Sequence, residues 1–201
     1  CAWPPASSRA YTMALQLIEP PTLQVVELAT AKLNARIDGT ALDPLVTTWI
    51  DVATGMAETA CDRFFREQTW RAELDDWPCL DRALPVHRAS ACAIAYWDGT
   101  GAWVPLAAGA FRYYPLHNGT GTSPDPAIGW PALGACYGGP RVRVDLTAGD
   151  TEADTVPIGV KQYVLAHVAL WAYLPEAAQS EPLKPAPWLD SLLGGLRVAS
   201  V

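Results

Sequence analysis

An almost continuous apolar run occupies residues 157–174, interrupted only by Lys161, Gln162 and His167. Its first residue is a proline, which suits the start of a helix, and the proline that follows the run cannot continue one. The length of about 18 residues approaches the roughly 20 that a membrane-spanning helix needs, but polar side chains lie inside the run. We therefore predict the central helix of a folded domain, buried on most of its sides.

Two further helices are predicted in the first third of the chain. Thr22 suits the N-cap of a helix over residues 22–37, and Gly39 ends that helix. Asp43-Pro44 then begins a second helix over residues 43–66, because an N-cap residue is followed there by proline at the first helical position.

The helix over residues 43–66 has two faces of different polarity at helical spacing. The face that we expect to be buried consists of Leu45, Trp49, Val52, Ala53, Met56, Ala60 and Phe64. The face that we expect in solvent consists of Thr47, Asp51, Thr54, Glu58, Asp62 and Arg66. Since the helices can cover one another, we expect no long apolar stripe to be left over and the isolated chain to be a monomer or a weak oligomer.

Between these helices and the apolar run, residues 67–149 show the two-residue alternation of β-strands. Asp98-Gly99 lies between two such stretches and predicts a β-hairpin. Residues 115–140 are rich in proline and glycine, which predicts a long irregular loop. The expected strands are residues 69–74, 91–97, 102–106, 111–114 and 141–146.

The order of these elements predicts an α+β fold, because helices and strands are segregated along the chain. We expect a mostly helical bundle of the long amphipathic helix and the buried apolar helix, with a small antiparallel β-sheet or hairpin as an insertion. This domain spans residues 13–174 and follows a flexible extension of residues 1–12. An extended C-terminal tail, residues 175–201, completes the chain.

Charge and cysteine content narrow the function classes. The net charge of −7, without a cluster of Lys and Arg, argues against a surface that binds nucleic acid. Five cysteines, odd in number and widely spaced, predict neither a disulfide framework nor a metal site, so free thiols in a reducing cytoplasm are expected. One alternative is a small lipid-anchored envelope protein, in which a mature chain begins at a modified Cys1.

The sequence contains no motif typical of an enzyme. A GxSxG nucleophile turn is absent, and His87 and His117 lack the partner of an HxH or HExxH zinc motif. His167 lies inside the predicted core helix, and Asp75-Asp76 is typical of a solvated turn. We expect no enzyme activity, no cofactor and no metal, with a small hydrolase as the alternative from another class.

Several short motifs follow one another over about residues 13–198. They are Ile18–Leu23, Glu58 ahead of Phe64-Phe65, Gln68-Thr69-Trp70, Leu84-Pro85-Val86, Asp98-Gly99, Leu146–Gly149 and Val156-Pro157. In this order they resemble the head–tail connector (adaptor or head-completion) proteins of long-tailed phages and gene transfer agents. The chain departs from the family pattern in two places: residues 172–176 lack an arginine, and the loop over residues 115–140 is longer.

The resemblance implies a structural protein of the virion neck, assembled in the cytoplasm of a bacterial host. It implies a homo-oligomeric ring, commonly of twelve copies, docked beneath the portal protein. The other face of the ring would meet a stopper, tail-terminator or tail protein, and DNA would pass through the lumen without being read. No reaction and no membrane contact are implied. The nearest alternative is a tail-completion or tail-terminator protein.

The tail carries the predicted partner interface. Three prolines, Pro182, Pro185 and Pro187, keep it extended, and a short apolar segment follows. We expect this segment to fill a groove on the portal, with a cation beside it to pair with a carboxylate. The alternative is that the segment packs back on its own domain. The predicted interface residues are Trp188, Leu189, Leu192, Leu193 and Arg197.

Overall fold

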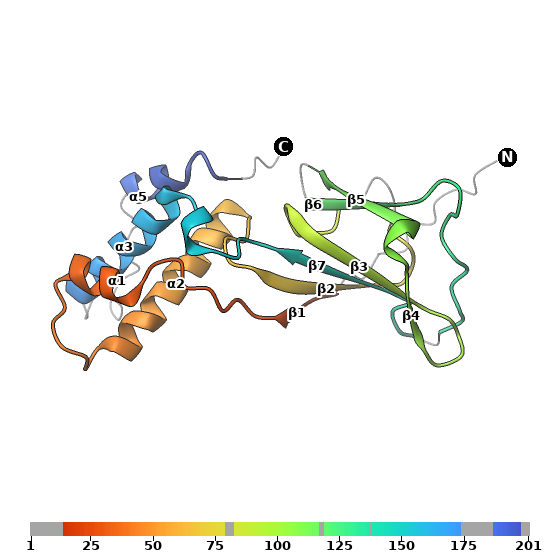
Figure 1. The fold of residues 1–201 in the computed structure, drawn as a ribbon, viewed down its shortest axis with the longest axis horizontal. Coiled ribbons are helices and arrows are strands. Elements are labelled where there is room, and N and C mark those ends of the chain that lie inside the picture. The colour runs from red at the N-terminus through yellow and green to blue at the C-terminus, as the bar shows by residue number, and fades with distance from the viewer. Residues whose placement is uncertain (1–13, 79–82, 117–118, 137, 174–186, 198–201) are drawn as a thin grey trace.

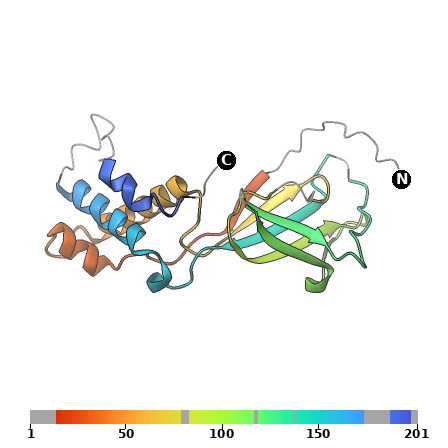
Figure 2. The ribbon, with the colours of Figure 1, turned by 90° about the horizontal axis from the view of Figure 1, so that it is seen from above.

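The computed structural model describes residues 14–78, 83–116, 119–136, 138–173 and 187–197. Its helices gather at one end of an elongated molecule and its strands at the other (Figures 1 and 2). Helical and strand residues are nearly equal, at 31% and 29%. The expectation of a mostly helical bundle with a small β-insertion is therefore wrong, because the strands build a second body with its own hydrophobic core.

Four α-helices form what we call the helical layer in the described part of the chain. They are α1 (Leu28–Ala35), α2 (Asp43–Cys61), α3 (Ile158–Tyr173) and α5 (Pro187–Leu193). Helix α3, from the apolar run, contacts each of the other three. Its side chains Val160, Val164 and Val168 are buried at the centre of this core. No helix among the described residues is long and apolar enough to cross a membrane.

Two of the predicted helices are shorter than expected. Helix α1 begins at Leu28 rather than Thr22, because the preceding residues connect it to the sheet, with Glu27 still extended at the N-cap. Helix α2 ends at Cys61 rather than residue 66, because Asp62 adopts a left-handed conformation with φ of 51° and closes the helix.

A five-stranded antiparallel sheet has the order β1-β2-β7-β3-β4. Its strands are β1 (Ala14–Glu19), β2 (Gln68–Leu74), β3 (Ala89–Trp97), β4 (Trp103–Pro105) and β7 (Val142–Ala148). The hairpin predicted at Asp98-Gly99 joins β3 to β4, with φ of +85° at the glycine. Strand β1 was not predicted, and it pairs with β2 along one edge of the sheet.

A second, two-stranded sheet joins β5 (Phe111–Leu116) to β6 (Gly119–Pro124). Strand β6 lies in the stretch predicted to be an irregular loop. Glycine in this strand reflects close packing rather than a loop, because a Cβ atom on Gly119 would lie 1.9 Å from the carbonyl oxygen of Leu84. Two 3₁₀ turns, Ala108–Ala110 and Ala153–Thr155, complete the described elements.

Candidate functional site: the junction and the exposed face of helix α2

Three chain segments connect the helical layer to the sheet within the described residues: 20–27, 62–67 and 149–157. Two of them are paired, since the Glu67 N–H donates to the Asp150 carbonyl at 3.0 Å and the Asp150 N–H donates to the Phe65 carbonyl at 3.3 Å. Gly149 permits this approach: with φ of +108°, its added Cβ would lie 2.2 Å from the Arg66 carbonyl oxygen.

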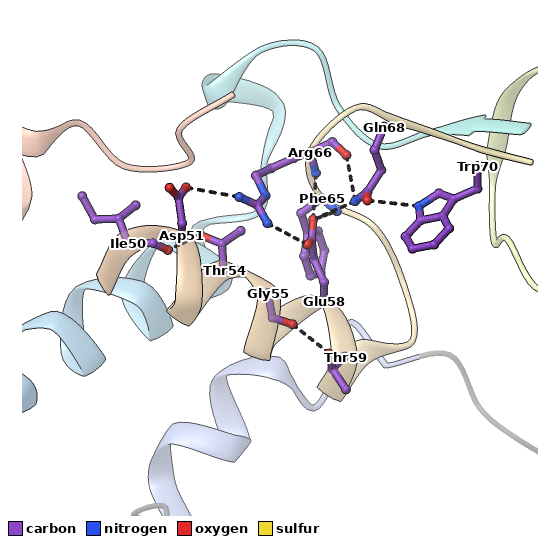
Figure 3. A network of polar contacts seen from close by, with 10 residues as sticks. All are labelled: Ile50, Asp51, Thr54, Gly55, Glu58, Thr59, Phe65, Arg66, Gln68 and Trp70. Carbon is purple, nitrogen blue, oxygen red and sulfur yellow. Dashed lines mark hydrogen bonds and ion pairs between the residues drawn. The ribbon is translucent and has the colours of Figure 1, made fainter. Parts of the chain in front are cut away.

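Glu58 on α2 is the centre of a polar network at this junction (Figure 3). Its Oε1 atom accepts hydrogen bonds from the Phe65 N–H at 3.0 Å and the Arg66 N–H at 3.2 Å. Its Oε2 atom lies 3.1 Å from Nη2 of Arg66, whose Nη1 reaches Asp51 at 3.3 Å. The carboxylate therefore fixes the chain where it leaves α2 for the sheet.

The network continues into the sheet through Gln68. The Gln68 side-chain amide donates to Glu58 at 3.5 Å, and the Trp70 indole N–H donates to the Gln68 side-chain oxygen at 3.0 Å (Figure 3). The indole also stacks on Phe64 at a centroid separation of 5.6 Å. These residues belong to motifs that carry the sequence resemblance. Those motifs therefore supply the contacts that connect the helical layer to the sheet.

A cleft of about 380 Å³ beside the network is the first candidate for chemistry. It contains a His–Asp pair, with Nε2 of His87 3.2 Å from Oδ2 of Asp62. Among the described residues that line it there is no serine or cysteine, and the Thr59 hydroxyl donates to the Gly55 carbonyl at 2.9 Å.

The buried histidine and the two buried or half-buried cysteines outside this cleft are held in packed surroundings. Nδ1 of His167 lies 3.0 Å from the Tyr163 carbonyl oxygen, one turn earlier in α3. Burial raises the pKa of the Cys61 thiol, and it raises the pKa of Cys92 to about 12, so both thiols are protonated at neutral pH. Among the described residues no His, Cys, Asp and Glu side chains cluster in a way that could hold a metal ion. His117, Cys1 and Cys79 lie outside those residues.

The buried side of α2 matches the predicted one only in part, since Ala53 is buried and Trp49 packs against the core. Leu45, Val52 and Met56 are 44%, 49% and 42% exposed, whereas Thr54 and Glu58 of the predicted solvent face are buried. Both buried polar groups are satisfied, since the Thr54 hydroxyl donates to the Ile50 carbonyl at 2.7 Å and Glu58 forms the network above. The side chains that do pack into the core are Val46, Ile50, Ala53, Ala57 and Cys61. The expectation that no apolar stripe would be left over is therefore wrong.

No known family profile matches the chain, and no curated protein matches it. Among solved structures, a chain from the neck of an empty gene transfer agent (GTA) particle, computed with C6 symmetry, matches with a TM-score of 0.74 and 19% identity. That match covers 94% of this chain and 97% of the other. The chain has the fold of a GTA neck protein.

Two related structures share this neck-protein fold. A chain in the virion of the native GTA particle matches with a TM-score of 0.71 and 20% identity, over 93% of this chain and 96% of that one. A chain from the native neck, computed with C12 symmetry, matches with a TM-score of 0.66 and 20% identity, over 92% and 97%. Because both chains are covered almost end to end, helices and sheets together make up the shared fold. The resemblance found in the sequence motifs is confirmed in the fold.

Within the neck-protein fold, α5 carries the predicted interface residues. Leu189 and Leu193 are buried in the core of the helical layer, and Leu192 packs partly against it. The approach to α3 is close, because a Cβ on Gly159 would lie 2.6 Å from the Leu192 carbonyl oxygen. Arg197 is exposed, and the side chain of Trp188 lies outside the described part. The leucines thus pack on their own domain, as in the second alternative, and contact of this segment with a partner stays a prediction.

Proposed function

We propose that the chain is a head–tail connector, a structural protein in the neck of a phage-like particle. The observation that carries this proposal is the match to a neck chain at a TM-score of 0.74 over 94% of this chain and 97% of that one. A match of this extent leaves almost no part of either chain outside the common fold. The function therefore attaches to the whole chain rather than to a shared module.

The chain acts as one subunit of a ring in this proposal. Support comes from the two neck structures, which were computed with C6 and C12 symmetry. Twelve copies and contact with the portal on one side and a stopper or tail protein on the other follow from the family resemblance. The junction around Glu58 suits such a subunit, because it holds two bodies that can each meet a different neighbour.

The proposed mechanism is assembly, with no chemical step. DNA passes through the ring lumen, and the net charge of −7 opposes tight binding to passing phosphates.

The proposal can be tested in cells that produce the particle. We expect a tagged chain to co-purify with particles on a density gradient, and a gold label on the tag to lie at the neck in electron micrographs. Deletion of the gene should leave DNA-filled heads without tails. Absence of the chain from purified particles would contradict the proposal.

The same preparation separates the connector from the tail-terminator alternative. Heads and tails are purified from strains in which the two cannot join. A connector is retained on tailless heads, whereas a tail terminator is retained on headless tails. Recovery of the tagged chain on tails alone would replace the connector assignment.

A further inference from the structure

The exposed side of α2 carries an apolar stripe that the subunit does not cover. The stripe, called here the α2 stripe, consists of Leu42, Leu45, Val52 and Met56, with spacings of three, seven and four residues. Trp49, which falls between them, packs in part against the helical core. Leu42, Leu45, Val52 and Met56 are each between 42% and 49% exposed. Such spacing is typical of a helix that packs against another element along its whole length.

The adjoining side of α2, about 100° around the helix axis, faces the core of the helical layer. Ile50, Ala53 and Ala57 there are fully buried against α3 and its neighbours. A helix whose apolar surface extends over two adjoining sides is normally covered on both. The isolated subunit covers only one of them.

The surface around the α2 stripe is nearly free of charge. Of the charged residues of α2, Asp51 is exposed on another side of the helix, about 100° or more around the axis from Val52 and Met56, and its carboxylate lies 3.3 Å from the Arg66 guanidinium. Asp62, just past the helix, is exposed as well. Asp43 pairs with Lys32 near the start of the helix, and Glu58 is buried. The other exposed neighbours are the small residues Thr48, Thr59 and Ala60. Small neutral side chains allow a second body to approach the helix closely.

This lack of charge points to the occupant. Copies of a chain with net charge −7 repel one another, so a neutral surface favours close contact between two copies. A strongly cationic partner, in contrast, would be matched by an acidic surface rather than by the α2 stripe.

We propose that the α2 stripe is the surface by which one copy of this chain contacts the next in the ring. This inference rests on the proposed function. In a ring of more than two copies the interface joins two different patches, so the stripe meets another part of the neighbouring copy rather than its α2. The helix has 19 residues and is about 28 Å long, so it supplies only part of the roughly 800 Å² per partner that a stable complex buries. The contact is therefore weak in free solution and strengthened in the closed ring.

The first experiment maps the contact in the purified full chain. A photo-crosslinking amino acid, p-benzoylphenylalanine, replaces Val52 in one variant and Ile158 in a matched control. Ile158 is 71% exposed and lies on another helix, as the first residue of α3. At about 1 mM protein even a millimolar contact is substantially occupied. We expect a product of twice the chain mass from position 52, with peptides of a second copy, and little or none from position 158.

The second experiment measures the strength of the contact. Sedimentation equilibrium compares the unaltered chain with V52K/M56K, which puts two like charges on the stripe, and with the control Ile158→Lys. We expect V52K/M56K to weaken self-association by at least about tenfold and the control to leave it unchanged. Circular dichroism checks that both variants keep the fold, as exposed substitutions should.

Different results would reject the α2 stripe as the contact surface and the connector function. No chain-to-chain product from position 52 at about 1 mM, or equal self-association of V52K/M56K and the unaltered chain, overturns the stripe as the contact surface. If the chain is nevertheless found at the neck, the connector function stands. A product from position 52 in a chain that never enters particles keeps the self-association surface and removes the connector function.

Discussion

The solvent-facing side chains of the sheet and of the helical layer differ: the sheet carries paired charges, and helix α2 carries an apolar stripe. On the outward side of the sheet, Arg71 lies opposite Asp145 and makes two hydrogen bonds to it, at 2.7 and 2.8 Å. Nε of Arg143 donates a hydrogen bond to Oε1 of Glu73 on the facing strand at 2.9 Å. The Arg143 guanidinium also lies over the Trp103 ring, 4.0 Å from its centroid. Helix α2, by contrast, leaves Leu45, Val52 and Met56 in solvent.

This difference indicates which part of the subunit is complete by itself. Cross-strand ion pairs satisfy the charges of the sheet within one chain and cover its aromatic surface. An exposed apolar stripe gains free energy only when another surface covers it. The centre of the sheet can therefore face solvent without a partner. The α2 stripe, like Leu15, Leu17 and Ile18 of the edge strand β1 at 36–39% exposure, is stabilised only when another surface covers it.

The largest effect is expected at the junction that joins the two bodies. Glu58→Ala removes the acceptor of two backbone N–H groups and leaves the Arg66 guanidinium, buried beside it, without its closest anion. We expect a loss of about 3–5 kcal/mol in the free energy of unfolding, measured by urea denaturation. Glu58→Gln keeps an oxygen acceptor and should cost less. Equal stability of Glu58→Ala and the unaltered chain would show that the junction does not depend on this carboxylate.

The next effect concerns α5 and decides between its two interpretations. Leu193 is fully buried in the helical core, so Leu193→Ala should lower the free energy of unfolding by about 2–4 kcal/mol. Leu33→Ala, at an 81% exposed position of α1, is the matched control and should change little. Deleting residues 187–201 should likewise lower the melting temperature. A truncated chain with unchanged melting temperature that fails to join portal-bearing heads would instead support docking of this segment.

A smaller effect is expected at His167 inside α3. His167→Gln removes a ring that is 4.2 Å from Tyr163 and 5.5 Å from Trp171 between centroids. Because glutamine retains a hydrogen-bond donor at this buried position, the expected cost is about 1 kcal/mol by thermal denaturation. Normal thermal stability combined with loss of the chain from particles would give His167 a role in assembly rather than in the core.

The smallest effect is expected on the sheet surface. A double-mutant cycle with Arg71→Ala and Asp145→Ala should give a coupling of about 0.5–1 kcal/mol that falls when salt is added, because both side chains are partly exposed. The cycle is measured by urea denaturation at low and high salt. A coupling several times larger and independent of salt would mean that the sheet is held together by this pair.

The sequence predicted elements well where local chemistry determines them. The turn at Asp98-Gly99 is one case, since the Asp98 carboxylate accepts the Thr100 N–H at 2.7 Å and glycine takes the positive φ. Helix α3 is another, because an apolar run between two prolines has few other solutions. Both depend on residues that are neighbours in the chain.

Predictions from the sequence failed where contacts between residues far apart in the chain determine the structure. The side of helix α2 with Thr54 and Glu58 is polar in sequence, yet both residues are buried, and the junction network explains this for Glu58. Strand β6 has a loop-like composition because Leu84 and Tyr114 leave no room for larger side chains at Gly119 and Gly121. In both cases the deciding neighbour lies far away in sequence or is supplied by the tertiary fold.

The three chain crossings between helices and sheet also determine how the subunit carries mechanical load. A single linker would act as a hinge, whereas residues 20–27, 62–67 and 149–157 resist bending and twisting together. Rotation of one body against the other would have to break the pairing of Glu67 with Asp150 and the bonds to Glu58 at once. In the proposed neck ring, we expect such a subunit to transmit force between its two bodies, and any opening or closing of the ring to take place at the contacts between copies.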